Sequence, residues 1–169
     1  MEGHLQLPRW SMAASLHRTL VLTGSSVFGL GYLPLAPGTW GSLGGLALWY
    51  AWSGLDWPLF AGLTALLTLL AIYLSSAAEA YYGGHDVQLI VVDEVAGMLF
   101  TVIAVPWQPY TVLTAFLLFR FLDAYKPPPI RWLDRHVGGG FGVVIDDVAA
   151  GIIGCGILHG IHIYKGAWW

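Results

Sequence analysis

Long, nearly continuous apolar runs alternate with short polar segments along the chain. The runs lack the two-residue alternation of a half-buried strand, and several approach the length at which a helix crosses a bilayer. In lipid, every backbone donor and acceptor needs an internal partner, so runs of this kind must be helical. The pattern therefore predicts an all-α, polytopic transmembrane helical bundle with about five membrane segments, at residues 43–53, 59–76, 89–105, 110–122 and 143–164.

The first apolar stretch, residues 16–32, differs from the others because it contains several Gly and Ser residues. Arg9 and Arg18 precede most of it, which is the shape of a signal peptide, but no small-x-small cleavage site follows cleanly. We expect the stretch to be retained as an N-terminal re-entrant or interfacial helix. The length of the chain fits a single membrane-embedded domain over residues 1–169.

The composition agrees with a lipid environment. Of the 169 residues, 57% are hydrophobic and only 10% are charged, whereas soluble domains carry about 25% charged residues. The net charge of −3 leaves no broad basic surface, which argues against a nucleic-acid partner. The single cysteine, Cys155, lies in an apolar run, where a thiol usually behaves as a small buried hydrophobe.

The predicted helices bring most charged residues to one membrane face. Segment 89–105 carries an acid pair near its start, and segment 110–122 returns to the same face and enters a polar loop at 123–142. The basic residues in these short loops predict that the face is cytoplasmic. The charged residues collected there include Asp93, Glu94, Arg120, Asp123, Lys126, Arg131, Asp134, Arg135, Asp146 and Asp147.

Two acid pairs, Asp93-Glu94 and Asp146-Asp147, follow short apolar runs and precede small residues. Carboxylates at membrane depth cost about 2.5–3.5 kcal/mol each, so they usually face a polar cavity and a partner. Either pair alone could simply favour a helix N-terminus. Four carboxylates close together would repel one another unless a cation neutralised them, and oxygen ligands of this kind suit Mg²⁺.

Two further motifs suit a phosphate group. Arg120-x-x-Asp123-x-x-Lys126 lies on one helical face, either as a phosphate clamp or as a salt-bridged helix end. Thr39 and Ser42 follow a loop rich in Pro and Gly at the start of a helix, either as phosphate contacts or as simple N-caps.

Taken together, these motifs resemble those of the phosphatidylglycerophosphatase A family of membrane phosphatases. The matching stretches are residues 31–42, 92–98, 119–127, 129–134 and 139–151. They occur in the family's order, and the set is specific although no single stretch is. Residues 1–25 carry no matching motif and form a variable N-terminal segment.

The resemblance implies a Mg²⁺-dependent enzyme of a bacterial inner membrane that hydrolyses phosphatidylglycerophosphate, a membrane lipid, to phosphatidylglycerol and phosphate. We expect the metal to bind Asp93, Glu94, Asp146 and Asp147. We expect the substrate phosphate to contact Thr39, Ser42, Arg120, Lys126 and Arg131. We expect Asp123, Asp134 and Asp146 to act in catalysis, by activating water or by forming a phospho-aspartate.

Two other classes of protein compete with this interpretation. A membrane cation or proton carrier would also place carboxylates inside the bilayer. Carriers often contain an inverted repeat, however, and both acid pairs here enter from one face. A CDP-alcohol phosphotransferase would need a spaced pattern of Asp-Gly, Ala-Arg, Gly and two Asp residues, which the sequence lacks.

Overall fold

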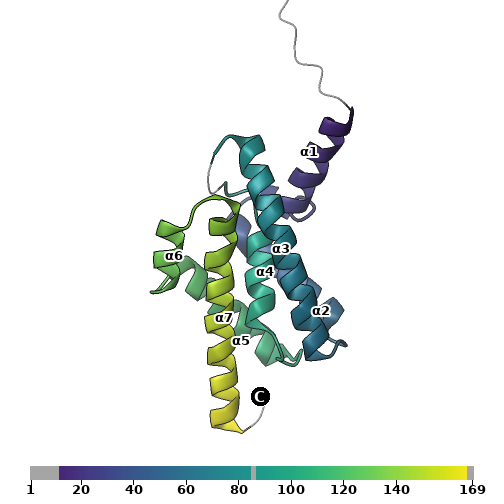
Figure 1. Cartoon of the computed structure of the whole chain (residues 1–169). Helices are drawn as coiled ribbons and strands as arrows, with labels where there is room; N and C mark the ends of the chain where they lie inside the picture. Colours follow the sequence, from purple (N-terminus) through teal and green to yellow (C-terminus); the bar gives the residue numbers. More distant parts are fainter. Residues whose placement is uncertain (1–11, 85–86, 167–169) are drawn as a thin grey trace, which may run out of the picture.

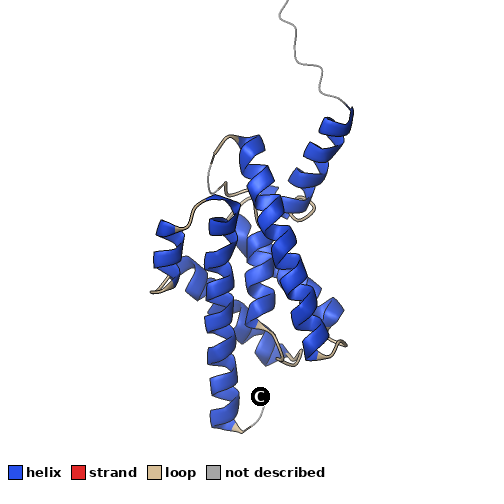
Figure 2. Ribbon diagram, viewed as in Figure 1, coloured by secondary structure: helices blue, strands red, loops and turns tan. Residues whose placement is uncertain are grey.

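The computed structural model describes residues 12–84 and 87–166, and within these ranges the regular structure is entirely helical (Figure 2). The elements are α1 (Met12–Ser25), a short 3-10 helix (Leu30–Tyr32), α2 (Pro37–Trp52), α3 (Trp57–Tyr82), α4 (Val92–Thr101), α5 (Pro109–Tyr125), α6 (Ile130–His136) and α7 (Gly139–Lys165). The all-α prediction is confirmed for this part of the chain.

Helix α4 lies at the centre of the bundle, between α3 and α7, which run antiparallel to each other (Figure 1). Eight of its ten residues are buried, so α4 is a core helix in spite of its acid pair. Glycines allow the close approach of α7: a Cβ atom at Gly97 would overlap the carbonyl oxygen of Asp147, and one at Gly151 would overlap the carbonyl oxygen of Gly97. The acidic residues of α4 and α7 are therefore brought together by backbone packing.

Two helices in the described part of the chain, α3 and α7, are long and apolar enough to cross a membrane. They contain 26 and 27 residues, and each includes an 18-residue stretch with a mean hydropathy of 1.9. The prediction of five membrane segments is not confirmed, because α2, α4 and α5 contain only 16, 10 and 17 residues.

Large apolar side chains nevertheless cover the outside of the bundle. On α3, Leu66 and Leu69 are 64% and 66% exposed, and on α5, Leu113 and Phe121 are each 60% exposed. Extended apolar surface of this kind marks contact with a membrane or a partner protein.

The prediction of a continuous polar loop at 123–142 is wrong, because helices occupy much of this range. Residues Ile130–His136 form α6, which is anchored by the fully buried Ile130, and α7 already begins at Gly139. The glycine-rich segment before Asp146 is thus largely the first turn of a helix. The stretch 16–32 is also not one helix, since α1 ends at Ser25 and the chain turns before the short 3-10 helix.

Candidate acidic centre

A pocket of about 250 Å³ opens where α4, α5, α6 and α7 meet. Seven charged side chains from these helices and their ends line it: Asp93, Glu94, Asp123, Lys126, Asp134, Asp146 and Asp147. The structure therefore brings together both acid pairs and the lysine that follows α5. Six carboxylates surround a single ammonium group, so the pocket has a strong excess of negative charge.

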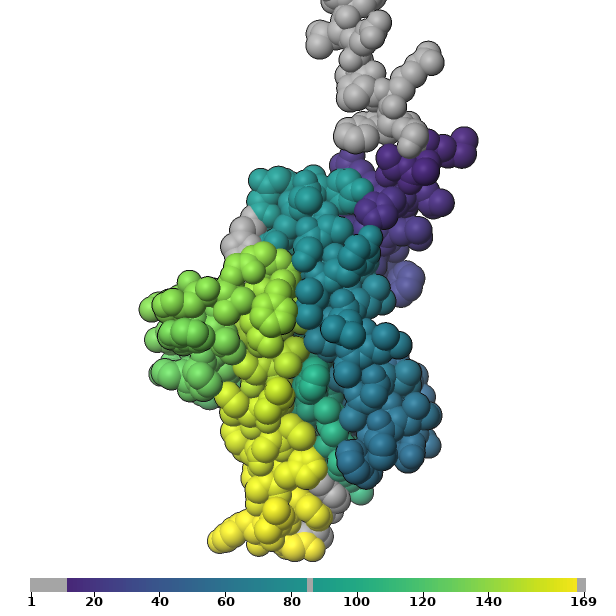
Figure 3. All heavy atoms as spheres, viewed as in Figure 1, coloured from purple at the N-terminus to yellow at the C-terminus, as the bar shows by residue number. Residues whose placement is uncertain are grey.

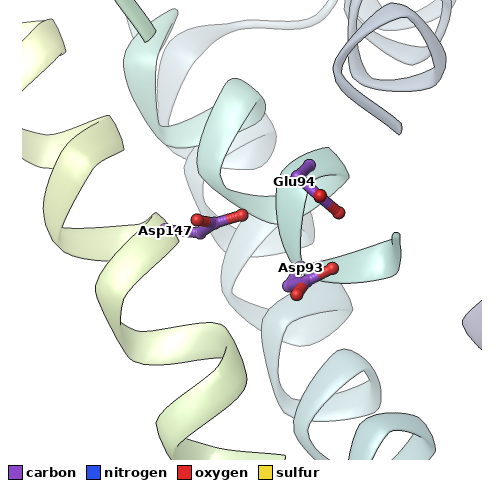
Figure 4. Close-up of side chains that lie close together, drawn as sticks. All are labelled: Asp93, Glu94 and Asp147. Atoms are coloured by element: carbon purple, nitrogen blue, oxygen red, sulfur yellow. The ribbon is translucent and has the colours of Figure 1, made fainter. Parts of the chain in front are cut away.

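Three of these carboxylates form a tight cluster. Asp93 and Glu94 come from the first turn of α4, and Asp147 reaches towards them from α7 (Figure 4). One ligand atom of each lies within 4.8 Å of the others, and Asp93 and Asp147 are only 8% and 4% exposed. One oxygen on each of the three groups has no hydrogen-bond partner among the described residues. Buried charges without partners are costly, so a cation bound by these oxygens would offset that cost.

The cluster fits a small hard cation. Mg²⁺ takes six oxygen ligands at about 2.0–2.1 Å, so neighbouring ligands lie about 3 Å apart and opposite ones about 4.2 Å apart. The 4.8 Å limit on the three carboxylate oxygens is close to that geometry. The donor set is entirely oxygen, which suits Mg²⁺ and not a thiolate- or imidazole-seeking metal.

The other three carboxylates are neutralised by basic side chains of the protein. Arg120 donates a hydrogen bond to Asp123 at 2.5 Å within α5. Lys126 bridges two elements, since its Nζ lies 2.5 Å from Asp134 of α6 and 2.6 Å from Asp146 of α7. One oxygen of Asp146 is still without a partner in the described structure.

Lys126 has an unusual backbone conformation at the end of α5. It is the C-cap of α5, with φ 47° and ψ 63°, a left-handed conformation that costs a non-glycine residue about 1–3 kcal/mol. Burial alone would lower the pKa of Lys126, but the hydrogen bonds and charges of Asp134 and Asp146 outweigh it and raise the pKa above its usual value. The group therefore stays a cation at neutral pH.

The start of α2 approaches the cluster from the opposite side. A Cβ atom at Gly38 would overlap Glu94 Oε1 and would touch the Arg120 guanidinium, so only glycine fits there without displacing them. A second pocket of about 210 Å³ lies on this side, lined in part by Gly38, Gln88, Arg120 and the acid pair of α4. Gly38 was not among the predicted site residues, although a glycine in the first turn of a helix is a signal in the sequence.

Thr39 and Ser42 are close to this side but do not line either acidic pocket. The N-cap of α2 is Ala36, so the N-cap interpretation of both residues is wrong. Ser42 is buried, donates to the Gly38 carbonyl oxygen at 2.8 Å, and lies 3.5 Å from the Arg120 guanidinium. Its position supports Arg120 and leaves its hydroxyl little access to a ligand.

Arg131 is not brought into the pocket. Its guanidinium donates to the carbonyl oxygen of Tyr125 at 3.0 Å and lies 5.8 Å from the centre of the Tyr125 ring. The structure thus places two of the three predicted phosphate-binding cations, Arg120 and Lys126, beside the carboxylates, and the third against Tyr125 at the end of α5.

Comparisons with known proteins agree with this picture. The family model for phosphatidylglycerophosphatase A matches residues 23–162. The Escherichia coli phosphatidylglycerophosphatase A is 44% identical over 135 residues, which cover 78% of this chain and 77% of that protein. The Haemophilus influenzae protein of the same name is 43% identical over 141 residues, covering 81% and 85% of the two chains.

A third relative, from Bacteroides thetaiotaomicron, is provisionally named a phosphatidylinositol-3-phosphatase. It is 38% identical over 142 residues, covering 78% of this chain and 86% of that one. No solved structure matches the chain.

Proposed function

The chain belongs to the phosphatidylglycerophosphatase A family, and from this membership and the acidic centre we propose that it hydrolyses phosphatidylglycerophosphate to phosphatidylglycerol and phosphate with the help of Mg²⁺. It is a phosphatase, and its place is in phospholipid synthesis. The carrier alternative is not favoured, because the named relatives are phosphatases.

We place the protein in a bacterial inner membrane with the acidic centre at the cytoplasmic face. Helices α3 and α7 cross the bilayer, and the shorter α2, α4 and α5 complete the embedded bundle behind their exposed apolar side chains. The arginines and lysine near α5 and α6 gather at the end that holds the pocket, as the positive-inside rule requires of a cytoplasmic face. The acyl chains of the substrate then remain in lipid while its headgroup enters the pocket.

Asp93, Glu94 and Asp147 would hold the metal, because they lie close together and leave carboxylate oxygens unused. Asp146 directly precedes Asp147, and its oxygen without a hydrogen-bond partner would be a fourth metal ligand. When bound, Mg²⁺ neutralises phosphate charge and helps to orient the reacting oxygens.

Lys126 of the acidic pocket and Arg120 of the neighbouring second pocket would bind the phosphate. Lys126 shares the cavity with six carboxylates and is paired with two of them, so an incoming phosphate competes with Asp134 and Asp146 for its ammonium group. Arg120 is restrained by Asp123 and supplies a planar pair of donors. Both cations would stabilise the negative charge that builds up on the phosphoryl oxygens.

A carboxylate released from Lys126 would act as the general base. The Asp134 side chain is 35% exposed, and losing its ion pair to the phosphate would leave it free to take a proton from water. The water oxygen then bonds to phosphorus, the bond to the glycerol oxygen breaks, and that oxygen gains a proton to give the alcohol of phosphatidylglycerol. Asp123 is the second candidate base, and direct attack by Asp146 would give a phospho-aspartate instead.

The observation that carries the proposal is the cluster of Asp93, Glu94 and Asp147, which lies in the same pocket as Lys126 and forms no ion pair with another described residue. The first test is phosphate release by the purified full chain in detergent, with Mg²⁺ or with EDTA. Phosphatidylglycerophosphate and phosphatidylinositol-3-phosphate serve as matched substrates. We expect release that requires Mg²⁺ and favours phosphatidylglycerophosphate. A folded protein that releases phosphate from neither lipid would contradict the proposal.

A further inference from the structure

A groove outside the acidic centre runs along α1 where this helix lies against α3. One part of it, of about 390 Å³, is lined by Ala14, Ser15, Arg18, Thr19, Leu22 and Tyr81. A second part, of about 320 Å³, shares Thr19 and Leu22 and continues to Phe28 and Tyr32. The two parts are both bordered by Thr19 and Leu22, and we treat them as one groove. Helix α1 stands beside the C-terminal end of α3 in Figures 1 and 3.

The groove is fixed in place by polar contacts between α1 and α3. The His17 ring lies 2.6 Å from the Tyr81 hydroxyl through Nδ1 and 2.8 Å from the Tyr73 hydroxyl through Nε2. Farther along, the Tyr32 and Tyr82 hydroxyls are 2.8 Å apart. These contacts hold α1 against α3 and orient the Tyr81 ring, so the groove has defined walls.

One end of the groove suits an anion. The Arg18 guanidinium lies over the Tyr81 ring, with 5.9 Å between its central carbon and the ring centre. Among the residues that the structure describes, no carboxylate forms an ion pair with Arg18. Tyr81, whose hydroxyl lies 2.6 Å from His17 Nδ1, lines the same part of the groove as Arg18, together with the hydroxyl-bearing residues Ser15 and Thr19. An arginine and hydroxyl groups together are typical of phosphate recognition.

The rest of the groove suits acyl chains. Leu22 and Phe28 line it, and Phe28 is 90% exposed. On the outer surface of α1, Leu16 and Leu20 are 59% and 61% exposed, so the helix presents apolar side chains to its surroundings. The groove thus has an arginine at one end and apolar side chains along the rest. This arrangement matches a phospholipid, which has an anionic phosphate at one end and acyl chains at the other.

We propose that the groove between α1 and α3 binds one anionic glycerophospholipid of the bilayer, with its phosphate on Arg18 and Tyr81 and its acyl chains over Leu22 and Phe28. The inference depends on the membrane placement proposed above and not on the phosphatase reaction. The groove shares no residue with the acidic pockets, so the bound lipid is not the substrate in its reactive position.

Native mass spectrometry of the full chain in a nonionic detergent tests this inference. Phosphatidylserine is the anionic probe, because it is neither substrate nor product of the proposed reaction, and phosphatidylcholine with the same acyl chains is the zwitterionic comparison. We expect wild type to retain phosphatidylserine at lower lipid concentrations than phosphatidylcholine. Arg18→Gln should weaken phosphatidylserine binding about tenfold, the factor expected for one hydrogen bond to a charged group.

Arg135→Gln is the matched control, since it removes an exposed arginine that does not line the groove. It should leave both lipids bound as in wild type. Equal phosphatidylserine binding by wild type and Arg18→Gln would overturn the proposal, as would equal binding of the two lipids by wild type.

A second variant keeps the test decisive if Arg18→Gln does not fold. Thr19 is exposed and lines both parts of the groove, so Thr19→Phe should fill it without changing the charge. We expect this variant to lose both lipids, and unchanged retention would show that they bind elsewhere. Lipid binding that persists in a protein without phosphatase activity would contradict the proposed function alone.

Discussion

The acidic pocket contains two sets of carboxylates that the protein treats differently. Asp123, Asp134 and Asp146 are each paired with Arg120 or Lys126 at 2.5–2.6 Å. Asp93, Glu94 and Asp147 line the same pocket but form no ion pair with another described residue, and each has a buried oxygen without a hydrogen-bond partner there, as one oxygen of Asp146 also does. We call the first set the paired carboxylates and the second the unpaired carboxylates.

The difference indicates which charges are compensated by side chains of the protein and which are better suited to bind a cation. An ion pair built from side chains contributes to the stability of the protein itself, although the net gain is often small after desolvation. Carboxylates that are clustered without such a pair repel one another, and this repulsion is relieved only when a cation binds to them. The unpaired carboxylates are therefore the best candidates for metal ligands, and the paired ones for groups exchanged during the reaction.

The strongest test of this distinction is Asp147→Asn. We expect phosphate release to fall by about a thousandfold or more, since a bound metal contributes several kcal/mol to charge stabilisation and about 1.4 kcal/mol is a factor of ten. Phosphate release in detergent at saturating Mg²⁺ measures the effect.

The matched control for that variant is Asp56→Asn, which removes an exposed carboxylate at the start of α3 that caps nothing with its side chain. It should keep the wild-type rate. If Asp147→Asn folds normally and retains most of the activity, the unpaired carboxylates are not the metal site.

Lys126→Met should give the next largest effect. We expect a loss of about a hundredfold in kcat/KM, because the variant removes the phosphate contact and leaves Asp134 and Asp146 without their shared cation. Steady-state kinetics with phosphatidylglycerophosphate would show this loss.

Two further variants, one conservative and one a control, show whether the loss is due to the charge at this position. Lys126→Arg keeps the charge and should recover part of the activity, whereas Lys165→Met removes a lysine at the far end of α7 and should have little effect. Equal activity of Lys126→Met and wild type would mean that the lysine serves only as a structural tie between α6 and α7.

Binding of Mg²⁺ should stabilise the wild type more modestly. At ten times its dissociation constant, a ligand specific for the folded state adds about 1.4 kcal/mol to the free energy of unfolding. We expect this gain in wild type and in Asp134→Asn, and its absence in Asp147→Asn, as measured by thermal unfolding with and without Mg²⁺. A gain that survives in Asp147→Asn and disappears in Asp134→Asn would reverse the assignment of the two sets.

Much of this centre could be predicted from the sequence. The acid pairs and Arg120-x-x-Asp123-x-x-Lys126 predicted that carboxylates and cations would gather at one end of the helices, because costly charges in apolar segments must share a cavity. The sequence could not show that Lys126 turns away from α5 to bridge Asp134 and Asp146, since a left-handed backbone at a lysine has no local sequence signal.

The helix lengths were less predictable. Residues 89–105 were predicted to be one membrane segment, but α4 covers only Val92–Thr101. The prediction failed because a buried core helix and a membrane-spanning helix have the same apolar composition. Helix α6 was missed for the opposite reason, since its polar residues and flanking prolines resemble a loop and only Ile130 ties it to the core.

The smallest effect is expected for Arg131→Gln. This variant distinguishes the phosphate-binding role predicted from the family motif from the contacts that Arg131 makes in the structure. The family motif suggested a phosphate contact, but the guanidinium is satisfied by the Tyr125 carbonyl oxygen and ring. Exposed contacts of this kind contribute about 1 kcal/mol or less, so kcat/KM should change by no more than about fivefold. Kinetics of Arg131→Gln beside Lys126→Met measure the contrast. A loss as large as that of Lys126→Met would mean that α6 moves when substrate binds and carries Arg131 into the pocket.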